Sequence, residues 1–260
     1  MCELFGMSSR LATNVTFSLS VLGDRGGRLG PHKDGWGVAF NEMNDFRIIK
    51  EAVPAANSAC LRFIEGHDLK SQIVISHIRR ATAPTVASFT NTHPFARELY
   101  GFTHVFAHNG DVPGVLQDRR LEPRYYYPQG ATDSERAFCA LADRLRDGLT
   151  PATVMRIESK LPIIEEWTSD VSQSGVFNFL LADPRYLYAH CSTHLFYVLR
   201  ECVSQTECLK SEELAIRLAQ DSNGMQRVAA VATEPLTRDE VWHPLPQGKV
   251  MAFREGERVN

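Results

Sequence analysis

The 260-residue sequence has no long hydrophobic run and almost no excess of charge. Its longest apolar stretch, about Val176 to Ala182, is interrupted by Asn178. That is far short of the ~20 residues that a membrane-spanning helix needs. Basic side chains number 28 and acidic ones 31, for a formal net charge of -3, whereas nucleic-acid-binding proteins normally carry a basic surplus. We therefore expect neither a membrane nor a nucleic acid as a partner.

Paired cysteines are also missing. No C-x-x-C pair occurs, and scattered cysteines of this kind argue against a zinc site and against a disulfide framework. Glu3 follows Cys2 directly, with no basic or apolar leader before it, so we expect no secretory signal. The cysteines are interpreted as reduced thiols of a cytoplasmic protein: Cys2, Cys60, Cys139, Cys191, Cys202 and Cys208.

The material for a core is ample, because 43% of the residues are hydrophobic and 9% aromatic, which excludes a disordered chain. No internal repeat or linker-like tract divides the sequence. We expect one domain over residues 2–260. The Gly-rich stretch Gly23 to Gly30 lacks the G-K-[ST] of a phosphate loop and is interpreted as a mobile loop.

Short β-branched and aromatic runs predict many strands, at Trp36–Phe40, Phe46–Lys50, Ile73–Ile78, Thr103–Ala107, Val176–Ala182, Tyr186–His190 and Val228–Thr233. Helical spacing is clearest from Asp133 onward, where Thr132 and Glu135 form a capping-box pattern. A second pattern runs from Val154 to Ile164, with Pro162 expected to kink or end it, and a weaker third spans Ala56 to Ile64. Because strands and helices do not alternate regularly, we predict an α+β fold with largely antiparallel sheets.

Two histidine pairs resemble metal ligands but have the wrong geometry. His104 and His108 lie in a predicted strand, where residues i and i+4 are about 13 Å apart, too far for one zinc ion. His190 and His194 are separated by a predicted turn. We therefore predict no metal site.

Cys2 carries chemistry that an internal cysteine lacks. Removal of Met1 would expose its α-amine, whose pKa of about 7.7 to 8.0 is close to that of a thiol, so the amine can act as base for its own side chain. Taken alone, a cysteine at position two is more often inert.

Three further motifs have both a plain and a functional interpretation. Asn109-Gly110 follows a strand and is a turn signal, but an amide and a backbone N–H facing Cys2 would offer two donors to an oxyanion. Arg79-Arg80 ends a strand, where a guanidinium can be solvated or can clamp a carboxylate. Asp133 in the first helical turn either favours the helix dipole or meets an ammonium group.

Five motifs together resemble the class II glutamine amidotransferases in order and spacing: Met1-Cys2-Glu3-Leu4-Phe5-Gly6, Ser76-His77-Ile78-Arg79-Arg80-Ala81-Thr82, Asn91-Thr92-His93-Pro94-Phe95, His108-Asn109-Gly110 and Thr132-Asp133-Ser134-Glu135. The later segment Val231 to Leu236 is similar to the closing strands of that family. The resemblance implies the four-layer αββα sandwich of the N-terminal nucleophile hydrolases. It implies no cofactor and no metal.

The resemblance also implies roles for the matching residues. Cys2 would attack the glutamine carboxamide, with Asn109 and Gly110 stabilising the oxyanion. Arg79 would hold the α-carboxylate and Asp133 the α-ammonium. Thr82 and His93 would line or support the pocket, and Gly35, Trp36 and Gly37 resemble the segment beside the nucleophile.

The sequence departs from the family pattern in two ways. Biosynthetic members often carry tryptophan where Arg80 stands. They also append a synthase domain, which we do not expect in this protein. The sequence is similar instead to the stand-alone YafJ-type group. Three interpretations stay open: glutamine hydrolysis with ammonia supplied to a separate synthase, hydrolysis of a γ-glutamyl peptide or conjugate, and a non-catalytic glutamine-binding subunit. A homodimer is a further open expectation.

Overall fold

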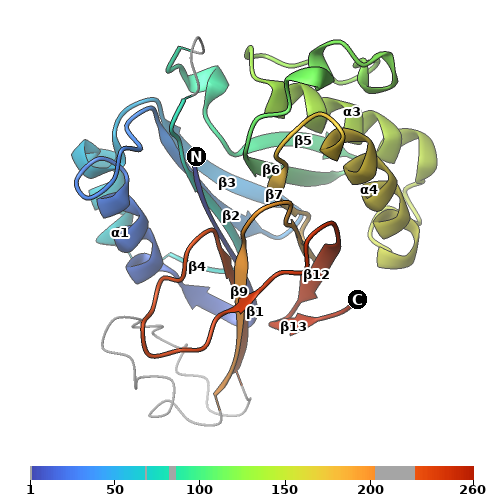
Figure 1. The fold of residues 1–260 in the computed structure, drawn as a ribbon. Coiled ribbons are helices and arrows are strands. Elements are labelled where there is room, and N and C mark those ends of the chain that lie inside the picture. Colours follow the sequence, from blue (N-terminus) through green and yellow to red (C-terminus); the bar gives the residue numbers. More distant parts are fainter. Residues whose placement is uncertain (1, 68, 82–85, 203–225) are drawn as a thin grey trace.

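The computed structural model describes residues 2–67, 69–81, 86–202 and 226–260. Two antiparallel β-sheets pack face to face, and helices cover their outer faces, so the chain forms four layers in the order αββα (Figure 1). The predicted α+β class with two mainly antiparallel sheets is confirmed.

The first sheet has the strand order β11-β9-β10-β1-β4-β2-β3. Its strands are β1 (Glu3–Asn14), β2 (Trp36–Glu42), β3 (Asp45–Glu51), β4 (Lys70–Ile78), β9 (Phe196–Cys202), β10 (Gln226–Ala232) and β11 (His243–Pro244). Alternate residues of β1 face opposite layers because the side-chain period of a strand is two. Leu4 packs between the sheets, whereas Phe5 and Met7 pack toward the helices.

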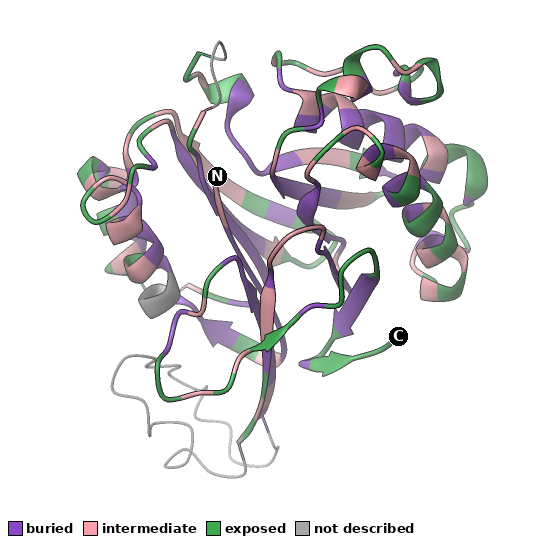
Figure 2. Ribbon diagram, in the orientation of Figure 1, coloured by how far each residue is buried: buried purple, intermediate pink, exposed green. Residues whose placement is uncertain are grey.

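The second sheet has the order β13-β12-β8-β7-β6-β5. Its strands are β5 (Phe95–Leu99), β6 (Phe102–Asn109), β7 (Asn178–Ala182), β8 (Leu187–His190), β12 (Val250–Arg254) and β13 (Glu257–Arg258). Every residue of β7 and β8 is buried, and Figure 2 shows the sheet interior as buried strands.

Helices α1 (Thr16–Arg25) and α2 (Ala59–Glu65) cover the first sheet, and α3 (Asp133–Gly148) and α4 (Ile157–Ser172) cover the second. The core therefore has three layers: one under each helix pair and one between the sheets. Among the described residues, no helix is long and apolar enough to span a bilayer.

Helix α3 begins as predicted, because the Thr132 hydroxyl accepts a hydrogen bond from the Glu135 N–H at 3.1 Å. The second half of the capping box is not formed. The Glu135 carboxylate instead accepts from the Gly130 N–H at 2.7 Å and pairs with Arg97 at 2.8 Å. The acid thus ties the helix to the preceding loop and to strand β5.

All seven predicted strands are present, with ends displaced by a few residues. Pro162 lies inside α4 and does not end it, because a missing N–H costs one hydrogen bond while the apolar face continues to Trp167 and Val171. The loop expected at Gly23 to Gly30 is wrong for residues 23–25, which form the last turn of α1. Strand β1 was not predicted, because its buried residues mix apolar Leu4, Phe5 and Met7 with polar Ser8 and Ser9.

Candidate active site

A cavity of about 370 Å³ opens where four elements end or begin. Strand β1 begins at Glu3, β4 ends at Ile78, β6 ends at Asn109, and α3 begins at Asp133. Five of the predicted site residues line this cavity: Cys2, Arg79, His93, Gly110 and Asp133. Positions 77 residues apart in the sequence thus meet because the antiparallel β1–β4 pairing places residues 2 and 79 at the same sheet edge.

Cys2 is half-buried at the cavity, and its sulfur is held by the backbone of Arg80. The Arg80 N–H donates to Cys2 Sγ at 3.2 Å, and the thiol lies 3.4 Å from the Arg80 carbonyl oxygen, to which it can donate. Burial raises the pKa of the Cys2 thiol, while the Arg80 N–H and nearby positive charge, including Arg79, act in the opposite direction. A thiol in this environment needs a base to become a nucleophile.

Gly110 has a backbone that no other residue adopts without strain. Its φ is +151°, and a Cβ atom there would lie 1.9 Å from the carbonyl oxygen of Val176. Asn109 is 1% exposed, and neither its side-chain nitrogen nor its oxygen has a hydrogen-bond partner in the described part of the chain. Gly110 lines the cavity, and the buried amide beside it does not. Such an unused donor is costly unless a ligand satisfies it.

Arg79 is almost fully buried, and its Nη1 donates to the Asp34 carbonyl oxygen at 3.4 Å. Within residues 2–67, 69–81, 86–202 and 226–260, no carboxylate forms an ion pair with it. Burial lowers the pKa of Arg79, and the Cys2 thiolate form and Asp34 oppose this shift. The guanidinium is therefore a buried cation with capacity for an anionic ligand.

Asp133 supplies the matching negative charge. Its Oδ2 accepts a hydrogen bond from the Val112 N–H at 2.7 Å, and its Oδ1 accepts from the Ser134 N–H at 2.7 Å. These bonds fix the carboxylate at the N-terminus of α3. None of the described basic side chains forms an ion pair with it.

Three buried histidines cluster at the cavity: His93 and His108 line it, and His77 packs against His93. The His77 and His93 rings are tilted against each other with centroids 4.3 Å apart, and in the described residues their ring nitrogens have no partner at normal hydrogen-bond geometry. Burial lowers the pKa of His77 to about 3 and that of His93 well below its ordinary value. His108 is bonded on both sides, accepting from the Ser134 hydroxyl at 2.8 Å and donating to the Val176 carbonyl at 3.1 Å. All three are therefore neutral at pH 7, and among the described lining residues the positively charged side chains are Arg79 and Arg80.

Gly35, Trp36 and Gly37 do not line this cavity. A Cβ on Gly37 would lie 2.2 Å from the His93 carbonyl oxygen, so the glycine allows the chain around His93 to cross strand β2. Trp36 is buried and donates to Glu51 at 3.2 Å. Thr82 lies outside the described residues, and its predicted role stays a prediction.

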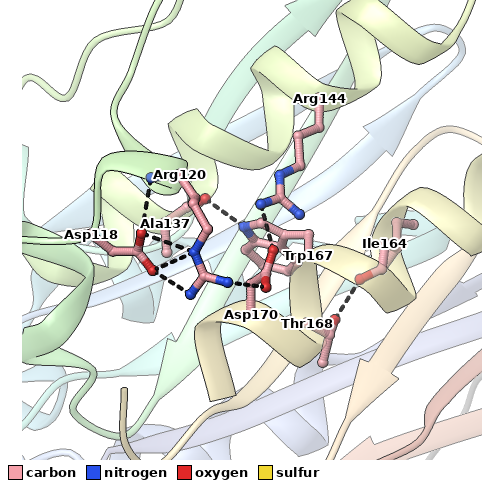
Figure 3. Close-up of polar contacts among 8 residues, drawn as sticks. All are labelled: Asp118, Arg120, Ala137, Arg144, Ile164, Trp167, Thr168 and Asp170. Carbon is pink, nitrogen blue, oxygen red and sulfur yellow. Dashed lines mark hydrogen bonds and ion pairs between the residues drawn. The ribbon is translucent and has the colours of Figure 1, made fainter. Parts of the chain in front are cut away.

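A charged network secures one wall of the cavity. Pro113 and Leu116 line the wall from a short 3₁₀ turn (Pro113–Leu116), which leads into a second one (Arg119–Leu121). Figure 3 shows the Asp170 carboxylate of α4 reaching Arg120 at 2.9 Å and Arg144 of α3 at 2.6 Å. In the same view the Trp167 indole donates to the Ala137 carbonyl at 3.0 Å. The two helices and the wall are thus fastened to one another.

Sequence reasoning missed two contributors to this site. The Asp34 carboxylate accepts from the Ala81 N–H at 2.8 Å and so fixes the chain after Arg79. Asp111 lines the cavity and acts to raise the pKa of Cys2. A signal for Asp111 was available, because it directly follows Asn109-Gly110. In the described ranges, no three His, Cys, Asp or Glu side chains are placed to hold a metal ion.

A family model described as glutamine amidotransferases class-II matches residues 1–260. The chain belongs to the class II glutamine amidotransferases. YafJ of Escherichia coli (strain K12), named as a candidate glutamine amidotransferase, is 39% identical, and the match covers 100% of both chains. A Haemophilus influenzae protein named in the same way is 35% identical, with 100% of this chain and 86% of that one covered.

Two solved structures agree with the fold. A predicted glutamine amidotransferase from Pseudomonas aeruginosa superposes with a TM-score of 0.72 at 32% identity, and the match covers 100% of both chains. The glutamine phosphoribosylpyrophosphate amidotransferase of B. subtilis gives a TM-score of 0.63 at 15% identity. That match covers 99% of this chain and 48% of the larger enzyme, and at this identity it supports the fold alone.

Proposed function

We propose that this amidotransferase-family protein hydrolyses the γ-carboxamide of glutamine to glutamate and ammonia, with Cys2 as the nucleophile. The observation that carries the proposal is the shared cavity of Cys2, Gly110, Arg79 and Asp133. A thiol, an oxyanion donor, a cation and a carboxylate are the four groups that a γ-glutamyl amide requires. Arg79 would hold the α-carboxylate and Asp133 the α-ammonium.

The chemistry then proceeds in two steps. Once Met1 is removed, the α-amine of Cys2 takes the thiol proton, and the sulfur attacks the amide carbon. The Gly110 N–H and the Asn109 amide stabilise the resulting oxyanion. The protonated amine gives its proton to the departing nitrogen, so ammonia leaves and a γ-glutamyl thioester remains. Water, deprotonated by the same amine, attacks the thioester and releases glutamate and the thiol.

A second candidate keeps the nucleophile but changes the leaving group. The cavity is lined by Pro113, Leu116 and Ala131 as well as by the charged residues. The amide nitrogen of glutamine needs no apolar wall, whereas a γ-glutamyl peptide or conjugate would use one. Comparing kcat/KM for glutamine with that for γ-glutamyl amides of small amines and amino acids separates the two. A higher value for the amides would assign the conjugates as substrates.

The ammonia would either be released or pass to a separate synthase, in the cytoplasm where thiols stay reduced. A synthase that co-purifies with this protein would show binding, but it would not show that ammonia is transferred. The test is synthase product formed from glutamine in the presence of this protein, compared with product formed from free ammonium. If the synthase forms product equally well from glutamine and from free ammonium, a dedicated partner is not supported.

The first experiment measures the intact mass of the purified protein before and after exposure to a diazoketone analogue of glutamine. Loss of the Met1 mass and a single adduct on Cys2 are expected. Cys60, another half-buried thiol whose pKa burial raises, provides the matched control: Cys60→Ala must label normally and Cys2→Ala must not. Retained Met1, or unlabelled Cys2 after Met1 loss, would instead favour the non-catalytic glutamine-binding role.

A further inference from the structure

The oxyanion pair Asn109–Gly110 is packed against the residues that lead into strand β7. Asn109 pairs with Asn178 in the β6–β7 register. Gly110 lies so close to Val176 that no side chain fits between them, and His108 donates to the Val176 carbonyl at 3.1 Å. The segment 176–178 therefore forms the surface on which the oxyanion pair rests.

Asn178 is fully buried and uses its whole hydrogen-bonding capacity. Its Nδ2 donates to the Asn109 carbonyl oxygen at 3.0 Å and to the Thr193 hydroxyl at 2.9 Å. Its Oδ1 accepts from the Ser192 N–H at 2.9 Å and the Thr193 N–H at 3.1 Å. One side chain thus connects the end of β6 to the turn after β8.

The contact to Asn109 has a directional consequence. The carbonyl of Asn109 and the N–H of Gly110 belong to one planar peptide unit and point in opposite directions when it is trans. A bond that holds the carbonyl therefore also sets the direction of the Gly110 N–H. An oxyanion donor must be aimed before the reaction begins, because its effect depends on preorganisation.

We propose that Asn178 is a positioning residue that aims the Gly110 N–H and holds Asn109 at the oxyanion site. The proposal rests on the proposed function for its catalytic consequence but makes a structural claim of its own. Asn178 touches no substrate atom and acts only through the Asn109–Gly110 peptide unit.

Gln226 offers a matched control in the other sheet. It is also buried, and its amide donates to the Leu11 carbonyl at 3.0 Å and to the Thr13 hydroxyl at 2.6 Å. Its oxygen accepts from the Leu11 N–H at 3.0 Å and the Arg227 N–H at 3.2 Å. Gln226→Ala therefore removes a similar set of four bonds at a position that does not line the cavity.

The experiment compares Asn178→Ala and Gln226→Ala with the unchanged protein. Steady-state kinetics with glutamine should show kcat reduced about 10²-fold in Asn178→Ala with KM nearly unchanged, because a misaimed donor affects the transition state. Gln226→Ala should keep kcat. Amide hydrogen exchange should become faster in peptides that contain residues 109–111 only in Asn178→Ala.

Thr193→Val is a second variant that keeps side-chain shape and removes one acceptor of the Asn178 amide. It should lower kcat several-fold without changing KM, and it tests the proposal if Asn178→Ala does not fold. Unchanged kcat together with unchanged exchange at residues 109–111 in either folded Asn178 or Thr193 variant would overturn the proposal. If exchange rises but the unchanged protein shows no Cys2-dependent hydrolysis, the positioning role stands and the proposed function fails.

Discussion

Two buried polar clusters in this molecule differ in how completely their groups are bonded. Beneath α4, the Lys160 ammonium contacts Asp183 at 2.5 Å and His104 at 2.9 Å, and the Tyr188 hydroxyl donates to Asp183 at 3.3 Å. Beside the cavity, His77, His93 and Asn109 are equally buried, yet their side-chain polar atoms have no partners in the described part of the chain.

The first cluster, formed by Lys160, Asp183, His104 and Tyr188, is closed to ligands. The Asp183 Oδ1 also accepts from the Arg185 N–H at 2.8 Å and the Tyr186 N–H at 2.9 Å. Burial alone would raise the pKa of Asp183, but Lys160 and His104 hold it below its ordinary value. In a buried pair of this kind, each charge depends on the other, because removal of one partner leaves the second charge uncompensated.

The second cluster retains capacity that only a bound molecule or water can use. Burial of an unsatisfied polar group costs roughly 1–3 kcal/mol, so such groups beside a cavity are candidates for contact with a bound molecule. The comparison teaches that burial by itself does not separate structural from functional polar groups. The two kinds differ in whether their polar atoms have hydrogen-bond partners within the protein.

The largest expected effect is on the nucleophile. Cys2→Ala should abolish turnover, because no other group at the cavity can form the thioester, and should leave the midpoint of urea unfolding nearly unchanged. Ammonia release and urea unfolding measure the two properties. Turnover at the level of the unchanged protein would disprove the assignment of Cys2.

Breaking the closed cluster should cost stability instead of activity. Lys160→Met leaves the Asp183 carboxylate buried without its cation and should lower the free energy of unfolding by about 3–5 kcal/mol. The double variant Lys160→Met with Asp183→Asn should recover part of this loss. Activity per folded molecule should stay the same in both, and a selective loss of kcat would mean that the cluster reaches the site.

Asn109→Ala should reduce activity and leave stability nearly unchanged. Removal of one oxyanion donor should reduce kcat by roughly 10²–10³. No side-chain hydrogen bond is lost, so the unfolding free energy should fall by at most about 1 kcal/mol from lost packing. Steady-state kinetics and urea unfolding of the same Asn109→Ala preparation measure the two effects. A large loss of stability would show that the Asn109 amide is hydrogen-bonded in solution.

Arg79→Ala should act mainly on substrate binding. A charge-assisted hydrogen bond contributes about 1.5–3 kcal/mol, which corresponds to roughly a 10- to 100-fold rise in KM for glutamine. The α-carboxylate contact is the same in ground and transition states, so kcat should change little. Arg79→Lys should recover part of the affinity, and a kcat loss at constant KM would contradict the role.

The last effect is on neither turnover nor substrate binding at neutral pH but on the pH dependence of stability. The pKa of His77 is about 3 in the folded protein, against 6.5 for an exposed histidine, so the unfolded chain binds a proton that the folded chain excludes. Stability should therefore decrease as pH falls from about 6.5 toward 3, by up to about 1.4 kcal/mol per pH unit. Between pH 7 and pH 5, the free energy of unfolding measured with urea should decrease less in His77→Leu than in the unchanged protein. An identical slope would indicate that His77 is not buried neutral.

Much of the fold followed from local patterns. The Thr132 cap and the apolar face after it predicted α3, and short β-branched and aromatic runs predicted β2, β3 and β6. Strand β1 was not predicted, because its long-range partners β4 and β10 stabilise a segment whose own composition is mixed. The order of the site motifs indicated the family, whereas the clamp by Asn178 gave no sequence signal.

The sequence by itself determined which reactive groups this protein has: a cysteine next to Met1, an Asn-Gly at a strand end, and an arginine and an aspartate at element ends. Only the tertiary structure decided which of them share a cavity and which polar groups stay unbonded. Strand pairing joins residues 2 and 79, and the hydrogen bond from Asn178 to the Asn109 carbonyl ties that peptide unit to strand β7. These contacts are long-range, and local patterns carry no information about the direction in which a peptide group points.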